Sequence, residues 1–445
     1  MSAATRIVRS FGSGNQKKWT MSFWMKVSRI NYTDGGGGNS RQVFGQTLSN
    51  YCRFIITGST QKIQFYESQG MDLRPSMTFN DPNAWYHVVV AVDTAQATAS
   101  NRVKIYINGV QQTAFDTETY PGQNVDLHFN KSGTHDIGGS SAYGGYDYFN
   151  GLLSHVHLTD GYAYAASDFG STDSTTGEWK INTSPSVSYG TTGYWILKDG
   201  NGLTDQSPNS NDWTLSTGTL TKTEDNPSNV FATMNPLDNY YQSSTFTEGN
   251  NTVEHGQSAW TYNTSTLKIP EATKFYCEGK VIAMNQNTCG IASNVTTGSG
   301  GSNTALPNIT GGVGFRGNQG DVLKATSTQS GTWATFTTND IIQIACDTVN
   351  NKLYFGKNGT WLNSGDPTSG ASGTGAISIN DNTDYFFAFG DNTDSARGKW
   401  SINFGNGYFG TTAVSSAGTN ASNNGIFEYD VPTGYTALST KGLNL

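Results

Sequence analysis

The chain has 445 residues, more than one ordinary domain needs, so its length favours two or three domains. Only 13% of the residues are charged, 12% are aromatic, and glycine occurs 53 times. This composition is typical of β-strands separated by Gly, Asn and Ser turns, and the aromatic content excludes general disorder. The net charge of -8 argues against a nucleic-acid partner, because an acidic surface repels a phosphate backbone. No apolar run approaches the roughly 20 residues that span a bilayer, so membrane insertion is not expected.

The amino-terminal stretch MSAATRIVRSFGSGNQ lacks the apolar core of a secretory signal peptide. The composition nevertheless resembles that of proteins exposed at a surface. A virus particle reconciles the two observations, because its proteins are made in a host cytoplasm and displayed outside. The expected location is therefore the surface of a virion.

The four cysteines stand at positions 52, 277, 289 and 346, and no two of them form a C-x-x-C pair. Cys277 and Cys346 fall on the apolar face of alternating segments. We therefore expect buried free thiols instead of a disulfide framework or a zinc site.

Apolar and polar residues alternate with a period of two along the first half, which favours strands over helices. Residues 19–27 predict a strand with one buried face, and residues 85–93 predict a central strand. Residues 103–115 predict a hairpin that turns at Asn108-Gly109. Residues 151–161 predict a further strand.

Two later segments complete the first half. Residues 166–190 are rich in Ser, Thr and Gly and predict a long connection. Residues 193–215 predict a strand followed by a loop rich in Asn, Asp and Ser. The first sandwich is therefore expected to extend past residue 170 and to take its closing strand from 193–215.

The second half repeats this style without repeating the sequence. Its clear strand segments are 274–284, 289–293, 340–362, 384–391 and 399–405. Short strands with turns between them are typical of β-sandwiches, and no solenoid or propeller period occurs.

The expected fold class is all-β, with two antiparallel β-sandwich, jelly-roll-like domains in tandem. We place the first domain at residues 1–215, a linker at 216–235 and the second domain at 236–445.

The first half contains five segments in a recognisable order: W-T-M-S-F-W-M (19–25), A-W-Y-H-V-V-V-A-V-D (84–93), V-K-I-Y-I-N-G-V (103–110), I-G-G (137–139) and F-N-G-L-L-S-H-V-H-L (149–158). Together they resemble the laminin-G-like branch of the concanavalin-like jelly-roll superfamily over about residues 1–215. The segment D-x-S-x-N-x-N-D-W-T-L (205–215) resembles one that usually opens such domains. Its late position implies a permuted arrangement or a closing strand beside the amino terminus.

The second half contains K-F-Y-C-E-G-K-V (274–281), D-I-I-Q-I-A-C-D-T-V-N-N-K-L-Y-F-G-K-N-G-T-W (340–361) and F-E-Y-D-V-P-T-G-Y-T-A-L (427–438). These segments resemble a SPRY domain over about residues 236–445. A laminin-G-like domain followed by a SPRY domain is similar to virion proteins of tailed bacteriophages. That resemblance implies a binding module, and it does not by itself define a function.

No catalytic constellation is evident. Glucanases of the concanavalin-like superfamily carry an E-x-D-x-x-E run, and none is found here. Asp116 and Glu118 share a strand face but lie in a polar turn region. His155 and His157, two residues apart, could bind a metal or could be hydrogen-bonded histidines on a sheet face, and the second interpretation is favoured. The protein is therefore not expected to be an enzyme.

One short loop concentrates oxygen-bearing side chains. Hard oxygen ligands are those that calcium prefers, so calcium is a candidate ligand although no cofactor is required. The alternative is Asx-turn chemistry, in which the same side chains cap their own backbone. The residues concerned are Asp199, Asp205, Asn209, Asn211 and Asp212.

Aromatic side chains on Gly-rich loops can stack on sugar rings at low entropic cost. Tyr143, Tyr146 and Tyr148 lie in such a loop, and Trp361 follows an Asn-Gly turn. These four residues are candidate glycan-binding residues. The alternative is packing on the rim of the sandwich or on a neighbouring subunit.

These observations favour a structural protein at the surface of a tailed phage particle that binds a host-surface glycan. Its other partners would be virion proteins and further copies of itself, since multiplied binding modules gain avidity. A long tail fibre needs a shaft with a sequence period, which is absent. A compact knob, a capsid decoration or a short tail adhesin is therefore favoured.

Two alternatives belong to other classes of protein. One is a polysaccharide-degrading enzyme of the concanavalin-like superfamily with a divergent active site. The other is a SPRY peptide-binding adaptor, which would carry a RING or B-box domain that four cysteines cannot supply.

Overall fold

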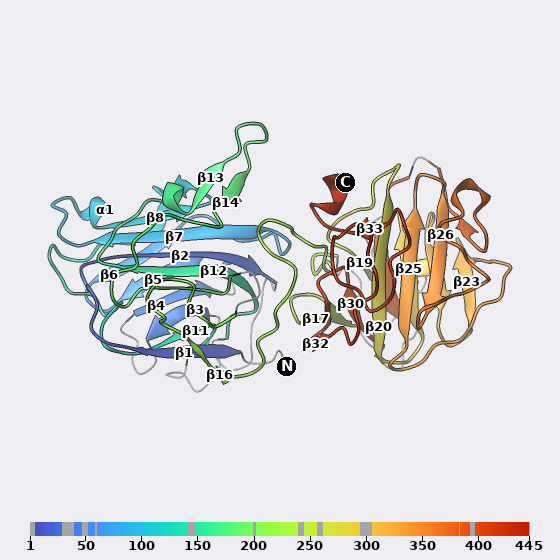
Figure 1. The fold of residues 1–445 in the computed structure, drawn as a ribbon, viewed down its shortest axis with the longest axis horizontal. Helices are drawn as coiled ribbons and strands as arrows, with labels where there is room; N and C mark the ends of the chain where they lie inside the picture. Colours follow the sequence, from blue (N-terminus) through green and yellow to red (C-terminus); the bar gives the residue numbers. More distant parts are fainter. Residues whose placement is uncertain are drawn as a thin grey trace. The chain divides into compact units, whose positions relative to one another are not determined.

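The computed structural model describes residues 5–28, 40–46, 52–57, 60–140, 148–198, 202–238, 244–255, 261–293, 305–381, 383–391 and 397–444. It divides into two compact units, each built almost entirely of antiparallel β-sheet (Figure 1). Unit 1 comprises residues 1–222 and 226–228, and unit 2 comprises residues 223–225 and 229–445. The all-β fold class with two sandwiches is confirmed. Among the described residues, no helix is long and apolar enough to cross a bilayer.

Unit 1 contains two large sheets. The larger has the spatial order β10 (Phe115–Thr119), β6 (Met71–Pro75), β5 (Ile63–Glu67), β4 (Cys52–Thr57), β3 (Ser40–Gln46), β11 (Gly133–Ile137), β1 (Arg6–Phe11) and β16 (Thr214–Thr217). The smaller has the order β15 (Tyr194–Ile196), β12 (Gly151–Asp160), β2 (Lys18–Val27), β7 (Trp85–Asp93), β8 (Val103–Ile107) and β9 (Val110–Gln111). Outside them lie α1 (Ala99–Arg102), η1 (Ala166–Asp168) and the hairpin of β13 (Gly170–Thr172) and β14 (Trp179–Ile181).

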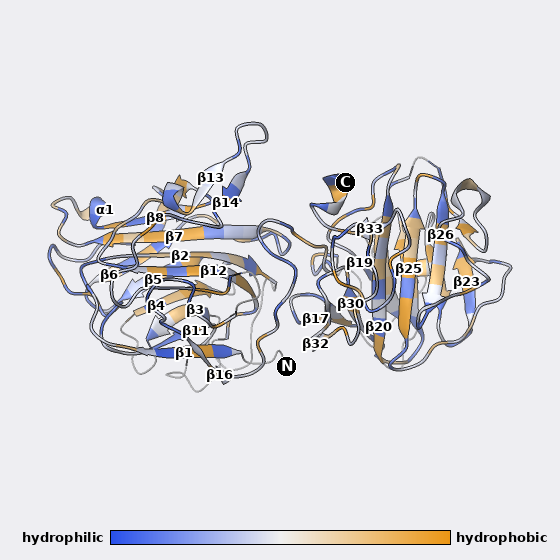
Figure 2. Cartoon of the chain, viewed as in Figure 1, coloured by the Kyte–Doolittle hydropathy of each residue, from blue (hydrophilic) through white to orange (hydrophobic). Residues whose placement is uncertain are grey.

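The core of unit 1 fills the space between these sheets. The predicted inner face of β2 is confirmed, because its alternate residues from Met21 to Val27 belong to the core. Phe54 of the larger sheet meets Phe23 and Phe65 edge to face, with ring centroids 5.1 and 5.0 Å apart. Such pairs add to the stabilisation from burial. Figure 2 shows that hydrophobic residues gather along strands such as β7.

The predicted hairpin turn is confirmed, but the hairpin is shorter than expected. Asn108 and Gly109 both have positive φ, 47° and 80°, as the tight turn between β8 and β9 requires. Phe115 was expected in this hairpin, yet it begins β10 on the other sheet. The strand pattern of 103–115 thus contains a change of sheet that alternation alone does not reveal.

The segment 166–190 was predicted as a plain connection and instead covers the outer face of the smaller sheet. Ala166 and Phe169 pack on Val89 of β7, and Trp179 packs at the edge of this cluster. Trp179 Nε1 donates to His87 Nδ1 at 3.0 Å. The outer residues Trp24 and Lys26 of β2 are buried as well, and Trp24 stacks on His87.

The closing strands of unit 1 come from residues 193–215, as expected. β15 pairs with β12, and β16 pairs with β1, so Leu215 lies opposite Ile7. The end of the unit thus lies beside its beginning.

Unit 2 also contains two large sheets. One has the order β17 (Thr245–Thr247), β18 (Thr252–Glu254), β30 (Lys399–Asn403), β20 (Lys274–Ala283), β25 (Ile341–Asp347), β26 (Lys352–Lys357) and β27 (Thr360–Trp361), with β28 (Ile377–Ser378) beside β26 and β33 (Thr436–Ala437) beside β20. The other has the order β19 (Thr261–Thr264), β29 (Phe386–Asp391), β21 (Asn287–Ala292), β22 (Val313–Arg316), β23 (Asp321–Lys324) and β24 (Ser327–Thr328). Shorter elements are the β31 (Tyr408–Phe409) and β32 (Thr412–Ala413) pair, η2 (Leu306–Asn308), η3 (Gly370–Ser372) and η4 (Gly442–Asn444).

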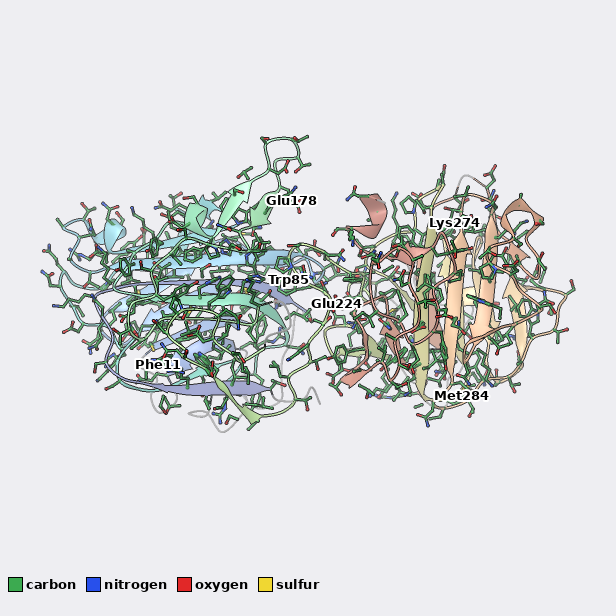
Figure 3. The ribbon with its side chains drawn as sticks, viewed as in Figure 1. Phe11, Trp85, Glu178, Glu224, Lys274 and Met284 are labelled. Atoms are coloured by element: carbon green, nitrogen blue, oxygen red, sulfur yellow. The ribbon has the colours of Figure 1, made fainter. Side chains whose placement is uncertain are left out.

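The strands predicted in the second half are confirmed. β20 lies centrally between β25 and β30, and Figure 3 labels Lys274 at one end of it and Met284 just beyond the other. Phe275, Cys277 and Val281 of β20 face the core. All four cysteines are buried and free, as expected.

The segment 216–235, expected to be a linker, takes part in both units. Thr217 belongs to β16 of unit 1, whereas Phe231, Ala232 and Met234 are buried in unit 2. Ala232 N donates to Leu438 O at 2.9 Å, so unit 2 also begins beside its end. The apolar side chains in the second part of this segment explain why that part packs into the core of unit 2.

Candidate functional site

Polar and aromatic side chains gather on the outer face of the larger sheet of unit 1, where β4, β5 and β6 lie side by side (Figure 1). Phe54, Phe65 and Leu73 belong to the core. Successive residues of a strand point to opposite faces, so the residues that alternate with these three face outward. The outward residues Arg53, Gln64, Tyr66, Asp72 and Arg74 are called the polar patch below.

The members of the polar patch hold one another in place. Arg74 donates from Nε and Nη2 to the two carboxylate oxygens of Asp72, at 3.2 and 3.0 Å. Gln64 Nε2 donates to Asp72 Oδ1 at 2.8 Å, and the Arg53 guanidinium lies 5.3 Å from the centroid of the Tyr66 ring. The Arg74 side chain is 42% exposed and that of Asp72 is 24% exposed, so a ligand can reach them. Ordered planar polar groups beside an aromatic ring suit the hydroxyls and apolar face of a sugar.

The tyrosines predicted to bind glycan are only partly within the described residues. Tyr143 and Tyr146 lie outside them. Tyr148 is half-buried, forms a bridge with Gln42 of β3, and packs so closely on Gly139 that a Cβ there would lie 2.6 Å from its ring. Because β3 pairs with β4, Tyr148 lies on the sheet that carries the polar patch.

Trp361 belongs to unit 2 and is half-buried. It meets Tyr276 edge to face, with ring centroids 6.4 Å apart, and packs against the aromatic cluster that includes Phe427. The Trp361 ring therefore packs on the outer face of the sheet that contains β20, and it is also partly exposed.

The oxygen-rich loop of unit 1 uses its side chains to bind its own backbone. Asp205 Oδ1 accepts from Trp195 N at 2.7 Å and Ser207 N at 2.8 Å, while its Oδ2 accepts from Asn211 N at 2.7 Å. Asp212 Oδ1 accepts from Asp205 N at 2.8 Å. These contacts agree with the Asx-turn alternative.

The remaining candidates of this loop have other contacts. Asn209 and Asn211 donate from Nδ2 to Gly193 O, and Arg9 donates to Asn211 Oδ1 and to Asp212 O. A guanidinium thus occupies the place beside these oxygens where a cation would be expected. Asp199 lies outside the described residues. Within the described part of the chain, no three His, Cys, Asp or Glu side chains form a metal-binding group.

Three histidines lie in a buried layer on the outer face of the smaller sheet. His157 Nδ1 contacts the Tyr189 hydroxyl at 2.9 Å, and His155 Nδ1 contacts Ser154 Oγ at 2.8 Å. A bulge separates Ser154 from His157, and His155 has φ of 48°, so the regular alternation expected for this pair is broken. Both imidazole rings lie beside Trp195, with ring centroids 6.0 Å from it for His155 and 4.9 Å for His157.

His87 of the same layer cannot activate a nucleophile in the observed arrangement. Trp179 donates to its Nδ1, so the neutral ring carries its proton on Nε2, which faces Ser22 Oγ at 2.8 Å. The ring therefore donates to the serine and does not accept its proton. Burial, with a smaller contribution from the nearby His155, lowers the pKa of His87 to about 3, so the ring stays neutral.

The acidic pair of β10 does not form a pair of facing carboxylates. Asp116 binds Lys62 and accepts from Ser76 Oγ at 2.9 Å, while Glu118 accepts from the Tyr120 hydroxyl at 3.0 Å. Glycoside hydrolysis needs two carboxyl groups on opposite sides of the scissile bond. These two residues instead serve separate surface contacts.

Unit 2 contains one buried carboxyl group with an unusual environment. Glu278 of β20 accepts from Tyr429 N at 2.8 Å and from the Tyr276 hydroxyl at 2.9 Å on Oε1, and from Glu428 N at 2.9 Å on Oε2. Burial raises the pKa of Glu278 to about 7, against the lowering effect of these three donors. The residue ties the segment around 428 to the sheet.

The polar patch was not found from the sequence. Its signal is a planar polar or aromatic residue at every second position of β5 and β6, between core residues, with Arg53 added from β4. Tyr162 and Tyr164, just after β12, were also missed, and their rings stack 5.6 Å apart.

Comparisons with known proteins support the resemblance stated for the first half. Residues 6–167 match the Laminin_G_3 family model, described as the concanavalin A-like lectin/glucanases superfamily. This match confirms a concanavalin-like domain there, a fold that fits a carbohydrate-binding role. No curated protein sequence matches the chain.

Several solved structures resemble parts of the chain. The SPRY domain of human HERC1 is 15% identical, with a TM-score of 0.30, over 38% of this chain and 96% of that one. The PSpry domain of TRIM65 is 11% identical, with a TM-score of 0.29, over 38% and 89%. A protein from Bacteroides ovatus to which carbohydrate binding is ascribed is 14% identical, with a TM-score of 0.30, over 49% and 61%. TM-scores this low carry no argument about function.

Proposed function

We propose that this protein is a non-catalytic, glycan-binding structural protein on the surface of a tailed phage particle. The polar patch is the observation that carries the glycan-binding part. Its donors, acceptors and aromatic ring are ordered before any ligand arrives, which lowers the entropic cost of binding. The concanavalin-like fold of residues 6–167 supports the same activity.

We assign the ligand to the outer face of the larger sheet. Asp72 accepts from sugar hydroxyls, Arg74 donates to them, and Tyr66 offers a face for the ring. The position on a particle rests on the sequence resemblance alone. It would make virion proteins, further copies of the chain and a host-surface glycan its partners.

A glycan array tests the binding proposal. The wild type is expected to bind one group of bacterial-surface glycans, and Asp72→Asn or Arg74→Ala is expected to weaken that binding roughly 10- to 100-fold, the effect of losing charged hydrogen bonds. Asp173→Asn is the matched control, because it breaks an exposed ion pair with Lys180 away from the patch. Equal binding by all variants would reject the patch.

Two further measurements separate the alternatives. A sensitive assay for reducing ends on the bound polysaccharide distinguishes a binding protein from a degrading enzyme. Immunogold electron microscopy of purified particles tests the proposed location, and particles without the protein would rule it out.

A further inference from the structure

A pair of stacked tyrosines lies just after β12, apart from the polar patch. Tyr162 is 42% exposed, and its ring lies 5.6 Å from that of Tyr164 at an interplanar angle of 18°. Among the described residues, Tyr164 is the one aromatic ring that stacks on Tyr162. We propose that the face of Tyr162 turned away from Tyr164 is a second carbohydrate-binding site, which stacks on the apolar side of a pyranose ring. The proposal rests on the glycan-binding function proposed above.

The backbone that carries Tyr162 is tightly held. Tyr162 O accepts from Thr20 Oγ1 at 2.8 Å and from Thr159 Oγ1 at 3.1 Å. Thr20 Oγ1 in turn accepts from Tyr164 N at 2.7 Å, and Gly161 N donates to Lys18 O at 2.9 Å. Four hydrogen bonds to two strands therefore fix the backbone on both sides of the ring before a ligand binds.

The second ring is fixed as firmly as the first. Ser188 N donates to the Tyr164 hydroxyl at 2.9 Å, and Tyr164 meets the buried Phe169 edge to face at 6.3 Å. Phe169 packs on His157, which stacks on Trp195 at 4.9 Å. A continuous series of ring contacts thus leads from the exposed tyrosine into the buried layer. A rigid aromatic surface loses little entropy on binding.

The surroundings of Tyr162 favour a sugar over a protein partner. The other large hydrophobic residues of unit 1 that are exposed in the described structure, Val110 and Leu215, lie on the edge strands β9 and β16. Lys18 of β2 contacts the backbone just before Tyr162, since its O accepts from Gly161 N. The Lys18 amine lies 3.3 Å from the Asp93 carboxylate. A protein interface needs a contiguous apolar area far larger than one ring. A single exposed ring face matches a molecule with one apolar face and many hydroxyls.

The test uses the full chain and the glycan array, followed by titration of the strongest-binding oligosaccharide. Tyr162→Ala is expected to lower the affinity about tenfold, and Tyr162→Phe is expected to retain it, because the ring and not the hydroxyl is used. Val110→Ala, which removes another exposed hydrophobic side chain of unit 1, is the matched control and should bind as the wild type. Equal melting temperatures show that Tyr162→Ala leaves the fold intact.

The outcomes separate this inference from the proposed function. Wild-type binding that falls with Tyr162→Ala but not with Val110→Ala supports the second site. Binding that is unchanged in Tyr162→Ala but weakened in Asp72→Asn overturns the second site and leaves the polar patch in place. A wild type that binds no glycan on the array overturns both.

Discussion

The buried Glu278 makes the stability of unit 2 depend on pH in a way that one substitution can isolate. Its carboxyl is almost fully buried, and burial raises its pKa from the ordinary 4.5 to about 7. A group with a raised pKa in the folded state contributes its full stability below the unfolded pKa. That contribution is lost as the pH rises through the folded pKa. The relevant window is therefore between 4.5 and about 7.

The size of the effect follows from the shift. One pKa unit corresponds to about 1.4 kcal/mol, so ionisation of the buried carboxyl destabilises unit 2 by about 3 kcal/mol once the window has been crossed. In Glu278→Gln the side chain keeps its size but no longer ionises. As the pH falls from about 8 to about 5, the free energy of unfolding of the wild type is therefore expected to rise by about 3 kcal/mol relative to that of Glu278→Gln.

Urea unfolding of both proteins at several pH values measures this difference directly. Other titrating groups are common to both proteins, so they cancel in the comparison. Glu254→Gln, at a surface position of the same unit, controls for the introduction of glutamine. A difference between wild type and Glu278→Gln that stays constant across the window would refute the reasoning, because the carboxyl would then not change its charge there.

Three further predictions concern unit 1. Asp160 is buried, which by itself raises its pKa, but the donors Asn15 N, Thr191 N, Thr192 N and Asn130 Nδ2 outweigh burial and lower it. Asp160→Ala should therefore lower the free energy of unfolding by about 1–3 kcal/mol near neutral pH. This loss should shrink as the pH falls through the lowered pKa of Asp160. Urea unfolding of both proteins at two pH values measures it. Calcium added to chelator-treated protein should leave the melting temperature unchanged, since the Asp205 oxygens already bind backbone N–H groups, and a clear rise would contradict this assignment. Phe54→Ala should destabilise unit 1 by about 3–5 kcal/mol in urea unfolding, and a cost below about 1 kcal/mol would mean that the packing between the sheets is looser than described.

The sequence predicted the strands and their inner faces because the period-two pattern is a local property. β2 shows the limit of this reasoning. Its inner residues were assigned correctly, yet Trp24 on its other face is buried too. Trp24 stacks on His87, which accepts a hydrogen bond from Trp179, 155 residues beyond Trp24 in the chain. The Trp179 ring fits against Gly109 and Gly170. No local pattern indicates which face a polar segment will fold onto.

The candidate site shows the same division between local and non-local information. The oxygen-rich loop could be recognised by composition, but composition does not show whether Asp205 binds a cation or its own backbone. The polar patch depends on the register of β5 against β6, which brings Gln64 to Asp72 and Arg74. Its residues are ordinary when each strand is taken separately.

The pairing of each unit's first and last segments has a consequence for synthesis and evolution. β16 must reach β1, and residues 438–440 must reach 230–232, before either sandwich is complete. Each unit therefore finishes folding only after its last strand has left the ribosome, and unit 1 can do so while unit 2 is still being translated. Ends that lie together also make each sandwich a cassette that a genome can move, insert or recombine without cutting through its interior.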